Sequence, residues 1–279
     1  MKNFKLNNGI EIPAIGFGTW QIEEGENAYN AVKTAIEKGY THIDTAAVYG
    51  NEVSVGKAIK DSGVAREDLF VTTKLWNDMR GEENAKKAFE ESITKLGLEY
   101  VDLYLLHWPA NATQFPENWK EINAASWKAL EELQAEGKIK AIGVSNFMVK
   151  HLEALLETAK VIPAVNQIEF HPGYTQEEVV ELCKANNILV QAWSPLGSGR
   201  ILQNETVKAI AANHEVSVGQ VCIQFAIQQG VLPLPKSENP INIENNLNTN
   251  FELSSEEIEQ LTTLKENGFS GLVPDEVAF

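Results

Sequence analysis

The chain has 279 residues and is acidic, with 23 lysine and arginine residues against 39 aspartate and glutamate residues and a formal net charge of −16. That charge repels polyanions, so nucleic acid and anionic membrane surfaces are excluded as partners. Hydrophobic residues make up 43% of the sequence, enough for a large core, and no apolar run reaches the length of a signal peptide or a membrane span, so we expect a cytoplasmic protein.

The predicted elements begin with a hairpin and continue as strands and helices in alternation. Segments 4–6 and 10–12 alternate polar and apolar residues around an Asn-Asn-Gly turn. Short apolar runs then predict eight strands, at 15–18, 42–45, 70–74, 101–107, 141–145, 165–168, 189–193 and 232–234. Amphipathic stretches predict helices at 26–38, 52–62, 83–96, 119–134, 149–158, 176–185, 206–214 and 218–228.

This order of elements predicts an α/β fold, a (β/α)8 TIM barrel with an N-terminal β-hairpin and extra C-terminal helices. Alternating strands and helices form parallel sheets, and eight unbroken repeats favour closure of the sheet. A dinucleotide-binding doubly wound sheet is excluded, because the segment that starts at Gly16 and Gly18 lacks the third glycine and opens no helix. No linker divides the chain, so residues 1–279 are expected to form one domain.

Polar residues follow several of the apolar strands at their carboxyl ends, where barrel enzymes carry their chemistry. Asp44 ends the second predicted strand and Tyr49 follows in the loop, while Lys74 and His107 end the third and fourth strands. Asp44 and Lys74 on neighbouring strands can form a buried ion pair that is purely structural. That reading leaves the tyrosine and the histidine at the same rim unexplained, so we prefer a catalytic set.

The four residues together predict a device that delivers a proton to a carbonyl oxygen. A phenol titrates near pH 10 and is a weak acid, and a neighbouring cation favours its ionised form. Lys74 would supply the cation, Asp44 would fix it, and His107 would orient the carbonyl group or relay the proton. Carbonyl reduction needs such a proton when hydride arrives.

Three motifs also resemble the aldo-keto reductase family, in its prokaryotic carbonyl and diketo-acid reductase branch, and the resemblance spans nearly the whole chain. They are GYTHIDTA at 39–46 with YGNE at 49–52 and a glycine at 56, KAIGVSNF at 140–147, and LPKS at 234–237. The resemblance implies the same catalytic residues, Asp44, Tyr49, Lys74 and His107, with Tyr49 as the general acid.

The resemblance further implies NADPH extended across the barrel mouth. Ser145, Asn146 and Gln167 would hold its carboxamide, and Trp193 would stack on the nicotinamide where tyrosine is more usual. The remaining residues of the implied site are Ser194, Leu196 and Gly197 along the pyrophosphate, Lys236 and Ser237 at the 2′-phosphate, and Trp20, Trp76 and Trp108 in the substrate pocket. For Trp108, plain packing is an equally good interpretation.

The adenosine end departs from the family pattern. Asn242 stands where an arginine is usual and Asn245 where glutamate is common, while Glu238 adds a negative charge nearby. NADPH is therefore expected to be preferred, with appreciable use of NADH. Thr41 also replaces an arginine, at a position to which we assign no function.

Two alternative functions stay open. A metal-dependent barrel hydrolase would use His42, Asp44, His107 and His171, although Lys74 among them would repel a metal. A non-catalytic nicotinamide-binding subunit is the second alternative, and it gives Tyr49 no purpose. The sequence predicts no disulfide, because Cys183 and Cys222 lie in helical stretches. The expected partner is a small carbonyl substrate, and the expected state is a monomer. Apolar residues of the tail over 269–279 could fold over the mouth, and the sequence leaves this open.

Overall fold

The computed structural model describes residues 3–265 and 268–279, and within them it confirms a barrel of eight parallel strands behind an antiparallel hairpin. The strands are β1 (Asn3–Lys5) and β2 (Glu11–Pro13) in the hairpin, then β3 (Phe17–Gly18), β4 (His42–Asp44), β5 (Phe70–Leu75), β6 (Val101–Leu106), β7 (Ile139–Ser145), β8 (Val165–Glu169), β9 (Leu189–Trp193) and β10 (Leu232–Pro233).

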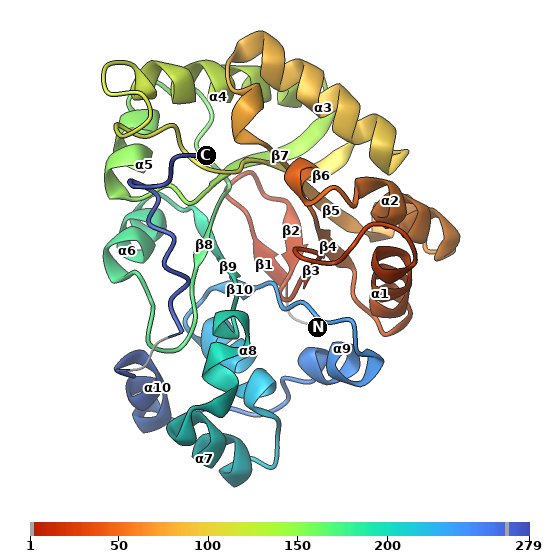
Figure 1. The fold of residues 1–279 in the computed structure, drawn as a ribbon, viewed down its shortest axis with the longest axis vertical. Helices are drawn as coiled ribbons and strands as arrows, with labels where there is room; N and C mark the ends of the chain where they lie inside the picture. The colour runs from red at the N-terminus through yellow and green to blue at the C-terminus, as the bar shows by residue number, and fades with distance from the viewer. Residues whose placement is uncertain (1–2, 266–267) are drawn as a thin grey trace.

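Helices surround these strands; α1 to α9 follow one another in chain order, and α10 lies beside α7 (Figure 1). They are α1 (Glu26–Glu37), α2 (Glu52–Asp61), α3 (Glu82–Leu96), α4 (Trp119–Ala135), α5 (Val149–Leu156), α6 (Glu177–Ala185), α7 (Glu205–Asn213), α8 (Val218–Gln228), α9 (Pro240–Leu247) and α10 (Ser255–Thr262). None of the helices in the described part of the chain is both long and apolar enough to cross a membrane.

The sheet closes into a barrel through hydrogen bonds between its first and last strands. Each strand from β3 to β10 pairs with its neighbour in sequence. The amides of Gly16 and Gly18 then donate to the carbonyls of Pro233 and Pro235, at 3.1 and 3.0 Å. A side chain at Gly16 would not fit, because an added Cβ would lie 2.5 Å from the imidazole of His42.

The predicted and observed elements agree closely, apart from the length of the first strand and several 3-10 turns. The first strand is two residues long rather than four, because residue 16 bonds only toward β10 and the regular pairing with β4 starts at Phe17. The segment from Gly197 to Gln203 forms 3-10 turns that the sequence did not predict. Positive φ angles at Ser198 and Gly199 interrupt these turns, so no helical periodicity marks them.

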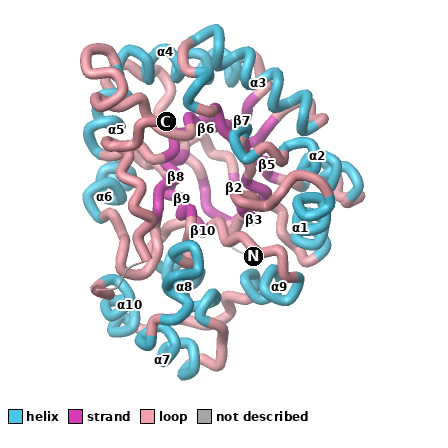
Figure 2. Tube along the Cα trace, in the orientation of Figure 1, coloured by secondary structure: helices cyan, strands magenta, loops and turns pink. Residues whose placement is uncertain are grey.

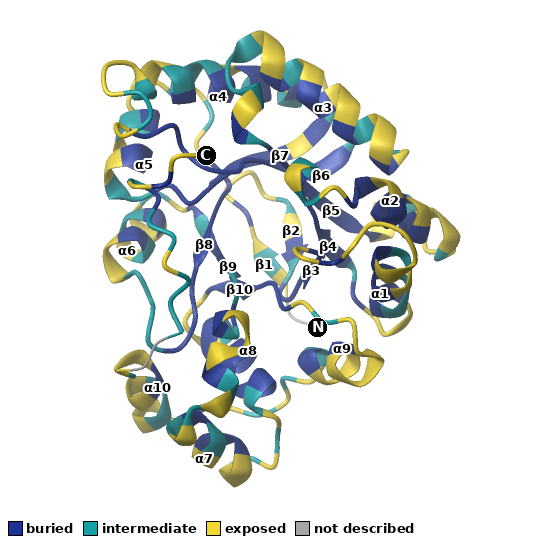
Figure 3. Cartoon of the chain, viewed as in Figure 1, coloured by how far each residue is buried: buried dark blue, intermediate teal, exposed yellow. Residues whose placement is uncertain are grey.

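The hairpin closes the amino-terminal end of the barrel and leaves the other end for the site. Leu6 and Ile12 of the hairpin pack in one buried cluster with side chains of the barrel interior such as Leu103 and Leu105. A second, larger cluster fills the layer between strands and helices. Most helices have a buried inner face and an exposed outer face (Figure 3), whereas α8 is buried along nearly its whole length. The four helices from α7 to α10 begin at residues whose side chains cap them; Ser217, for example, caps α8 in a capping box with Gln220.

Candidate active site

A cavity of about 820 Å³ opens at the carboxyl ends of the barrel strands. Its lining residues are Gly18, Trp20, Gln21, Asp44, Val48, Tyr49, Trp76, His107, Trp108, Ser145, Asn146, Gln167, Trp193, Ser194, Pro195, Leu196, Ser198, Gly199, Leu202, Ser217, Val218, Gly219, Leu234, Lys236, Ser237, Asn242, Asn245, Asn246, Leu272 and Phe279. The cavity therefore collects nearly every residue that the sequence singled out. Lys74 lies just behind Asp44 and Tyr49, and Gly197 is buried beneath the wall next to Ile201.

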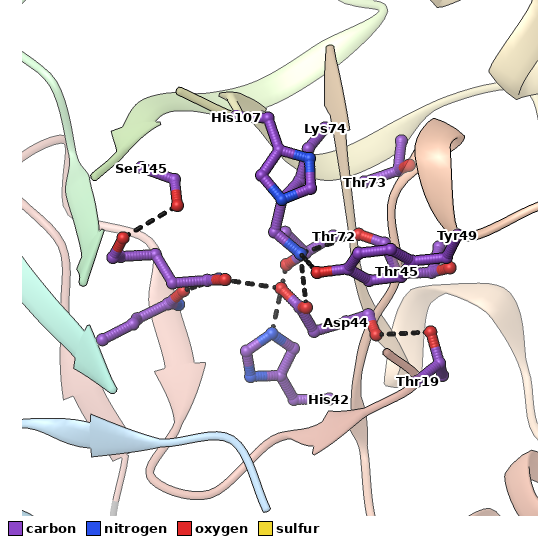
Figure 4. A network of polar contacts seen from close by, with 12 residues as sticks. Thr19, His42, Asp44, Thr45, Tyr49, Thr72, Thr73, Lys74, His107 and Ser145 are labelled. Carbon is purple, nitrogen blue, oxygen red and sulfur yellow. Dashed lines mark hydrogen bonds and ion pairs between the residues drawn. The ribbon is translucent and has the colours of Figure 1, made fainter. Parts of the chain in front are cut away.

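Lys74 connects the catalytic candidates at the floor of the cavity (Figure 4). Its ammonium group is fully buried and donates to Asp44 Oδ1 at 2.6 Å, to the carbonyl of Thr45 at 2.9 Å and to the hydroxyl oxygen of Tyr49 at 3.2 Å. A lysine ammonium has three donors and no acceptor, so these three oxygens saturate it. The tyrosine oxygen accepts in this contact, and its own hydrogen is left free to point into the cavity.

Burial and charge set the protonation states of these groups. Burial raises the pKa of Tyr49, and Lys74 opposes this only in part, so the phenol stays protonated at neutral pH. Burial acts to lower the pKa of Lys74, but Asp44 and Tyr49 outweigh it and the pKa is raised, so the ammonium stays charged. Burial, together with Lys74, lowers the pKa of His107 well below its usual value. The site thus holds a neutral phenol and a neutral imidazole.

Two side-chain amides, Asn146 just after β7 and Gln167 on β8, face the same cavity, and their orientations are fixed by their partners. Asn146 Nδ2 donates to the carbonyl of His107 at 2.9 Å, while its Oδ1 accepts from the indole N–H of Trp193 at 2.7 Å. An indole only donates and a carbonyl only accepts, so this amide has one orientation. Gln167 Nε2 donates to Asp44 Oδ2 and to Gln191 Oε1, both at 2.9 Å.

Strained backbone gathers at the cavity. Of the seven non-glycine residues with positive φ in the described chain, four line it, namely Gln21, Asn146, Ser194 and Ser198, with φ between 48° and 63°. Such conformations persist only where the surrounding structure enforces them, and they cluster at functional sites.

Asn51 holds the loop of Tyr49 in place, which the sequence did not predict. The tyrosine ends a 3-10 turn, Ala47–Tyr49, between β4 and α2. Asn51 is fully buried, accepts from the hydroxyl of Thr45 at 2.9 Å and donates to the carbonyls of Thr19 and Ile22 at 2.9 and 3.0 Å. It lies inside the first motif, but only the fold shows that its amide ties two loops together.

Aromatic side chains form the wall next to Tyr49, and the carboxyl-terminal tail completes it. Phe279 stacks on Trp76 with ring centroids 5.6 Å apart and meets Trp108 edge-on at 5.3 Å. Trp76 also meets His107 edge-on at 5.2 Å. Residues 268–279 are loop (Figure 2) and are held by Asn111, whose amide donates to the carbonyls of Pro274 and Val277. Two apolar residues of this tail, Leu272 and Phe279, line the cavity.

The opposite end of the cavity is open and weakly charged. Lys236 is exposed and pairs with Glu238 at 2.8 Å. Asn242 and Asn245 project from α9 and are exposed. Within the described residues, no group of three or more histidine, cysteine, aspartate or glutamate side chains could hold a metal ion. Cys183 and Cys222 are buried and unpaired with each other, in agreement with the sequence prediction.

Comparisons with known proteins agree with this architecture. The model of the aldo/keto reductase family matches residues 14–266. The chain is 47% identical to a glyoxal reductase of Bacillus subtilis (strain 168), over 99% of this chain and 97% of that protein. An aldo/keto reductase of Brucella melitensis matches with a TM-score of 0.87 and 44% identity, over 94% of this chain and 98% of that chain. An aldo-keto reductase of Bombyx mori in complex with NADP matches with a TM-score of 0.86 and 37% identity, over 94% and 92%.

The chain therefore belongs to the aldo/keto reductase family, and it is an oxidoreductase.

Proposed function

We propose that this protein reduces an aldehyde or ketone to the alcohol with NADPH, and that Tyr49 is the general acid. The observation that carries the proposal is the position of Tyr49. Its hydroxyl accepts from the buried Lys74 and keeps a hydrogen for the cavity. When bound, NADPH supplies the hydride. The protein itself holds the carbonyl compound and protonates its oxygen.

Proton delivery follows from the charges around the phenol. The carbonyl oxygen becomes negative as hydride adds to its carbon, and a hydrogen-bond donor next to it lowers the barrier. Tyr49 gives up its proton to that oxygen, and the tyrosinate left behind faces the Lys74 ammonium at 3.2 Å. Asp44 keeps the ammonium in place through its contact at 2.6 Å. A cation held in this way stabilises the tyrosinate without any rearrangement.

His107 is proposed to orient the substrate oxygen rather than to donate the proton. Its lowered pKa keeps the imidazole neutral, and its Nδ1 is buried without a hydrogen-bond partner. Because a buried N–H without a partner is rarer than a buried free acceptor, we place the hydrogen on Nε2. The ring meets Tyr49 edge-on with centroids 5.6 Å apart, so both donors can reach one oxygen.

The polar residues of the cavity fit a nicotinamide dinucleotide. Ser145, Asn146 and Gln167 present fixed hydrogen-bonding groups beside Asp44, as a carboxamide requires. Trp193 adds a flat indole, and Ser194 and Leu196 continue along the wall. The pyrophosphate role of Gly197 is indirect, because this residue lies beneath the lining.

Lys236 and Ser237 are proposed to bind the 2′-phosphate that distinguishes NADPH from NADH. The pairing of Lys236 with Glu238 and the neutral side chain of Asn242 weaken this recognition. We therefore propose preference for NADPH together with appreciable use of NADH.

The substrate is proposed to be a small, uncharged carbonyl compound. The wall around Tyr49 consists of Trp20, Trp76, Trp108 and Phe279, and of the described residues that line the cavity, Lys236 at the far end is the only lysine or arginine. The similarity to a glyoxal reductase supports small dicarbonyls as first candidates. All four catalytic candidates come from one chain, so a monomeric, single-domain enzyme is part of the proposal.

The two alternatives receive less support. A non-catalytic cofactor-binding subunit gives no reason for the Tyr49, Lys74 and Asp44 contacts. A metal hydrolase conflicts with the saturated Lys74 ammonium next to Asp44 and with the lack of a ligand cluster in the described chain.

Replacement of Tyr49 by phenylalanine tests the proposal. Tyr49→Phe is expected to lower kcat by roughly two or more orders of magnitude, the scale of general acid catalysis, with the Kd for NADPH nearly unchanged. Tyr100→Phe is the matched control, because this tyrosine ring also lies beside two cations, Arg66 and Lys140, but outside the cavity. A Tyr49→Phe variant with near-normal kcat on a panel of aldehydes and dicarbonyls would exclude the assignment.

A further inference from the structure

Gln191 is a buried polar residue in the middle of the apolar strand β9, and no step of the proposed reaction uses it. Its side chain is fully inaccessible to solvent, and it lies opposite Gln167 of β8 in the parallel register. Its Oε1 accepts from Gln167 Nε2 at 2.9 Å, while its own Nε2 is buried without a hydrogen-bond partner. An apolar residue of similar size would avoid that unpaired group, so packing alone does not explain a glutamine here.

The one hydrogen bond that this side chain makes within the described residues fixes the amide of Gln167. One hydrogen of Gln167 Nε2 goes to Asp44 Oδ2, and the other goes to Gln191 Oε1. Both donors of that amide are then satisfied, and the atom left for the cavity is its carbonyl oxygen. Gln167 therefore presents an acceptor to a bound ligand and also a donor to the carboxylate that holds Lys74.

We propose that Gln191 is a positioning residue, which acts through Gln167 to preset both the carboxamide contact of the nicotinamide and the orientation of the Asp44 carboxylate. This inference rests on the proposed function and adds to it a residue outside the cavity wall. Without the acceptor of Gln191, one buried N–H of Gln167 lacks a partner. The amide then rotates away to satisfy it, and the acceptor leaves the cavity.

Stability and function should respond to Gln191→Met in opposite directions. Methionine has a similar volume and lacks the unpaired buried Nε2, so the melting temperature is expected to stay the same or to rise. The Kd for NADPH, measured by fluorescence quenching, is expected to rise about tenfold, which corresponds to about 1.4 kcal/mol. The value of kcat is expected to fall several-fold. A residue with a purely structural role would show the reverse, lower stability with normal binding.

A double-variant cycle tests whether the effect passes through Gln167. In a Gln167→Met background, Gln191→Met is expected to have no further effect on the Kd for NADPH, because the amide on which it acts is gone. Gln191→Glu retains an oxygen acceptor at the same place, and its Kd is expected to stay within about threefold of the wild type. If Gln191→Met does not fold, Gln191→Glu still tests whether an oxygen acceptor at this position is what sets the Kd for NADPH.

Gln224→Met is the matched control. Gln224 resembles Gln191 in being a buried glutamine that is hydrogen-bonded to another glutamine; its Nε2 donates to Gln228 at 3.1 Å. It lies on α8 and does not line the cavity. The Gln224→Met substitution should leave the Kd for NADPH unchanged. Additive effects of Gln191→Met and Gln167→Met, an unchanged Kd in Gln191→Met, or a tenfold weaker Kd in Gln191→Glu would each overturn the inference. Failure of the proposed function is distinct, because the wild type would then show no NADPH-dependent reduction at all.

Discussion

The two lysines at opposite ends of the cavity are held in very different ways. Lys74 is fully buried and its ammonium contacts three oxygens, one from an equally buried aspartate. Lys236 is about a third exposed and its one ion pair is with the exposed Glu238. An exposed pair contributes little to stability and exchanges easily with solvent or ligand. A buried pair is costly to break, since removal of one partner leaves an uncompensated charge.

The difference matches the two tasks that we propose for these ends. Proton transfer needs fixed distances, and at the Tyr49 end every charged group and amide has its orientation imposed by neighbours. Discrimination between two cofactors needs only a difference in affinity, which exposed and replaceable residues can provide. Substitutions should therefore have large effects at the Tyr49 end and graded effects at the Lys236 end.

The largest effect is expected from Lys74→Met. The tyrosinate formed in the reaction would lose its cation, so kcat should fall by roughly a hundredfold or more. Lys74 lowers the pKa of Tyr49, so its loss should raise that pKa and move the alkaline limb of the pH–rate profile to higher pH. Asp44→Asn should have a milder effect, because the ammonium remains.

Folding must be separated from catalysis in this experiment. The single variant leaves Asp44 buried and unpaired, which costs about 3–5 kcal/mol of stability. The double variant Lys74→Met with Asp44→Asn removes both charges, so it should recover much of the melting temperature and none of the activity. An unchanged rate and pH profile in a folded Lys74→Met variant would leave the lysine a structural role only.

The sequence predicted the fold, and it predicted that Asp44, Lys74 and His107 lie close together, for a physical reason. Carboxyl ends of parallel strands converge at one rim, so Asp44, Lys74 and His107 had to lie near one another once the barrel was inferred. The eight strands and the helices fell within a few residues of their predicted bounds, because apolar periodicity and buried faces coincide.

Contacts that depend on side-chain direction escaped prediction. The Trp193–Asn146 and Gln191–Gln167 hydrogen bonds join residues 47 and 24 positions apart, and periodicity carries no information about rotamers. The anchoring of the tail by Asn111 spans more than 160 residues. One signal was present for Gln191, a polar residue inside an apolar strand, but such a residue points to a site only when its partner is known.

The next largest effect is expected from acid. Low pH should destabilise the protein mainly through protonation of His42, which lies near Asp44 and Lys74. Burial, and then Lys74, lowers the pKa of His42 to about 3, against about 6.5 in an unfolded chain. Between these values the unfolded state binds more protons, so stability is complete above pH 6.5 and declines as the pH falls. At pH 5 this single histidine costs about 2 kcal/mol.

Urea unfolding at several pH values measures this cost. His42→Gln should reduce the pH slope of stability by about one proton below pH 6.5. His214→Gln is the control, because this histidine is partly exposed and pairs with Glu257 far from the cavity floor. Equal slopes in the wild type and in His42→Gln would show that the acid sensitivity arises elsewhere, for example at His151, where burial lowers the pKa to about 4.

The smallest and most selective effect is expected at the Lys236 end. Asn242→Arg places a guanidinium on the cavity wall beside Lys236 and Ser237, where it can contact a 2′-phosphate with a charge-assisted hydrogen bond worth about 1.5–3 kcal/mol. The Kd for NADPH should tighten about tenfold to hundredfold, while the Kd for NADH should hardly change. Lys236→Ala should shift the preference in the opposite direction.

Asn248→Arg controls for the added charge, since Asn248 ends α9 outside the cavity lining. Both Kd values are measured at one fixed ionic strength, because exposed phosphate contacts weaken as salt is added. If the wild type already rejects NADH by about a thousandfold or more, or roughly 4 kcal/mol, another basic group must hold the phosphate. The contrast that we draw between Lys74 and Lys236 would then be wrong for Lys236, while the interpretation of Lys74 would be unaffected.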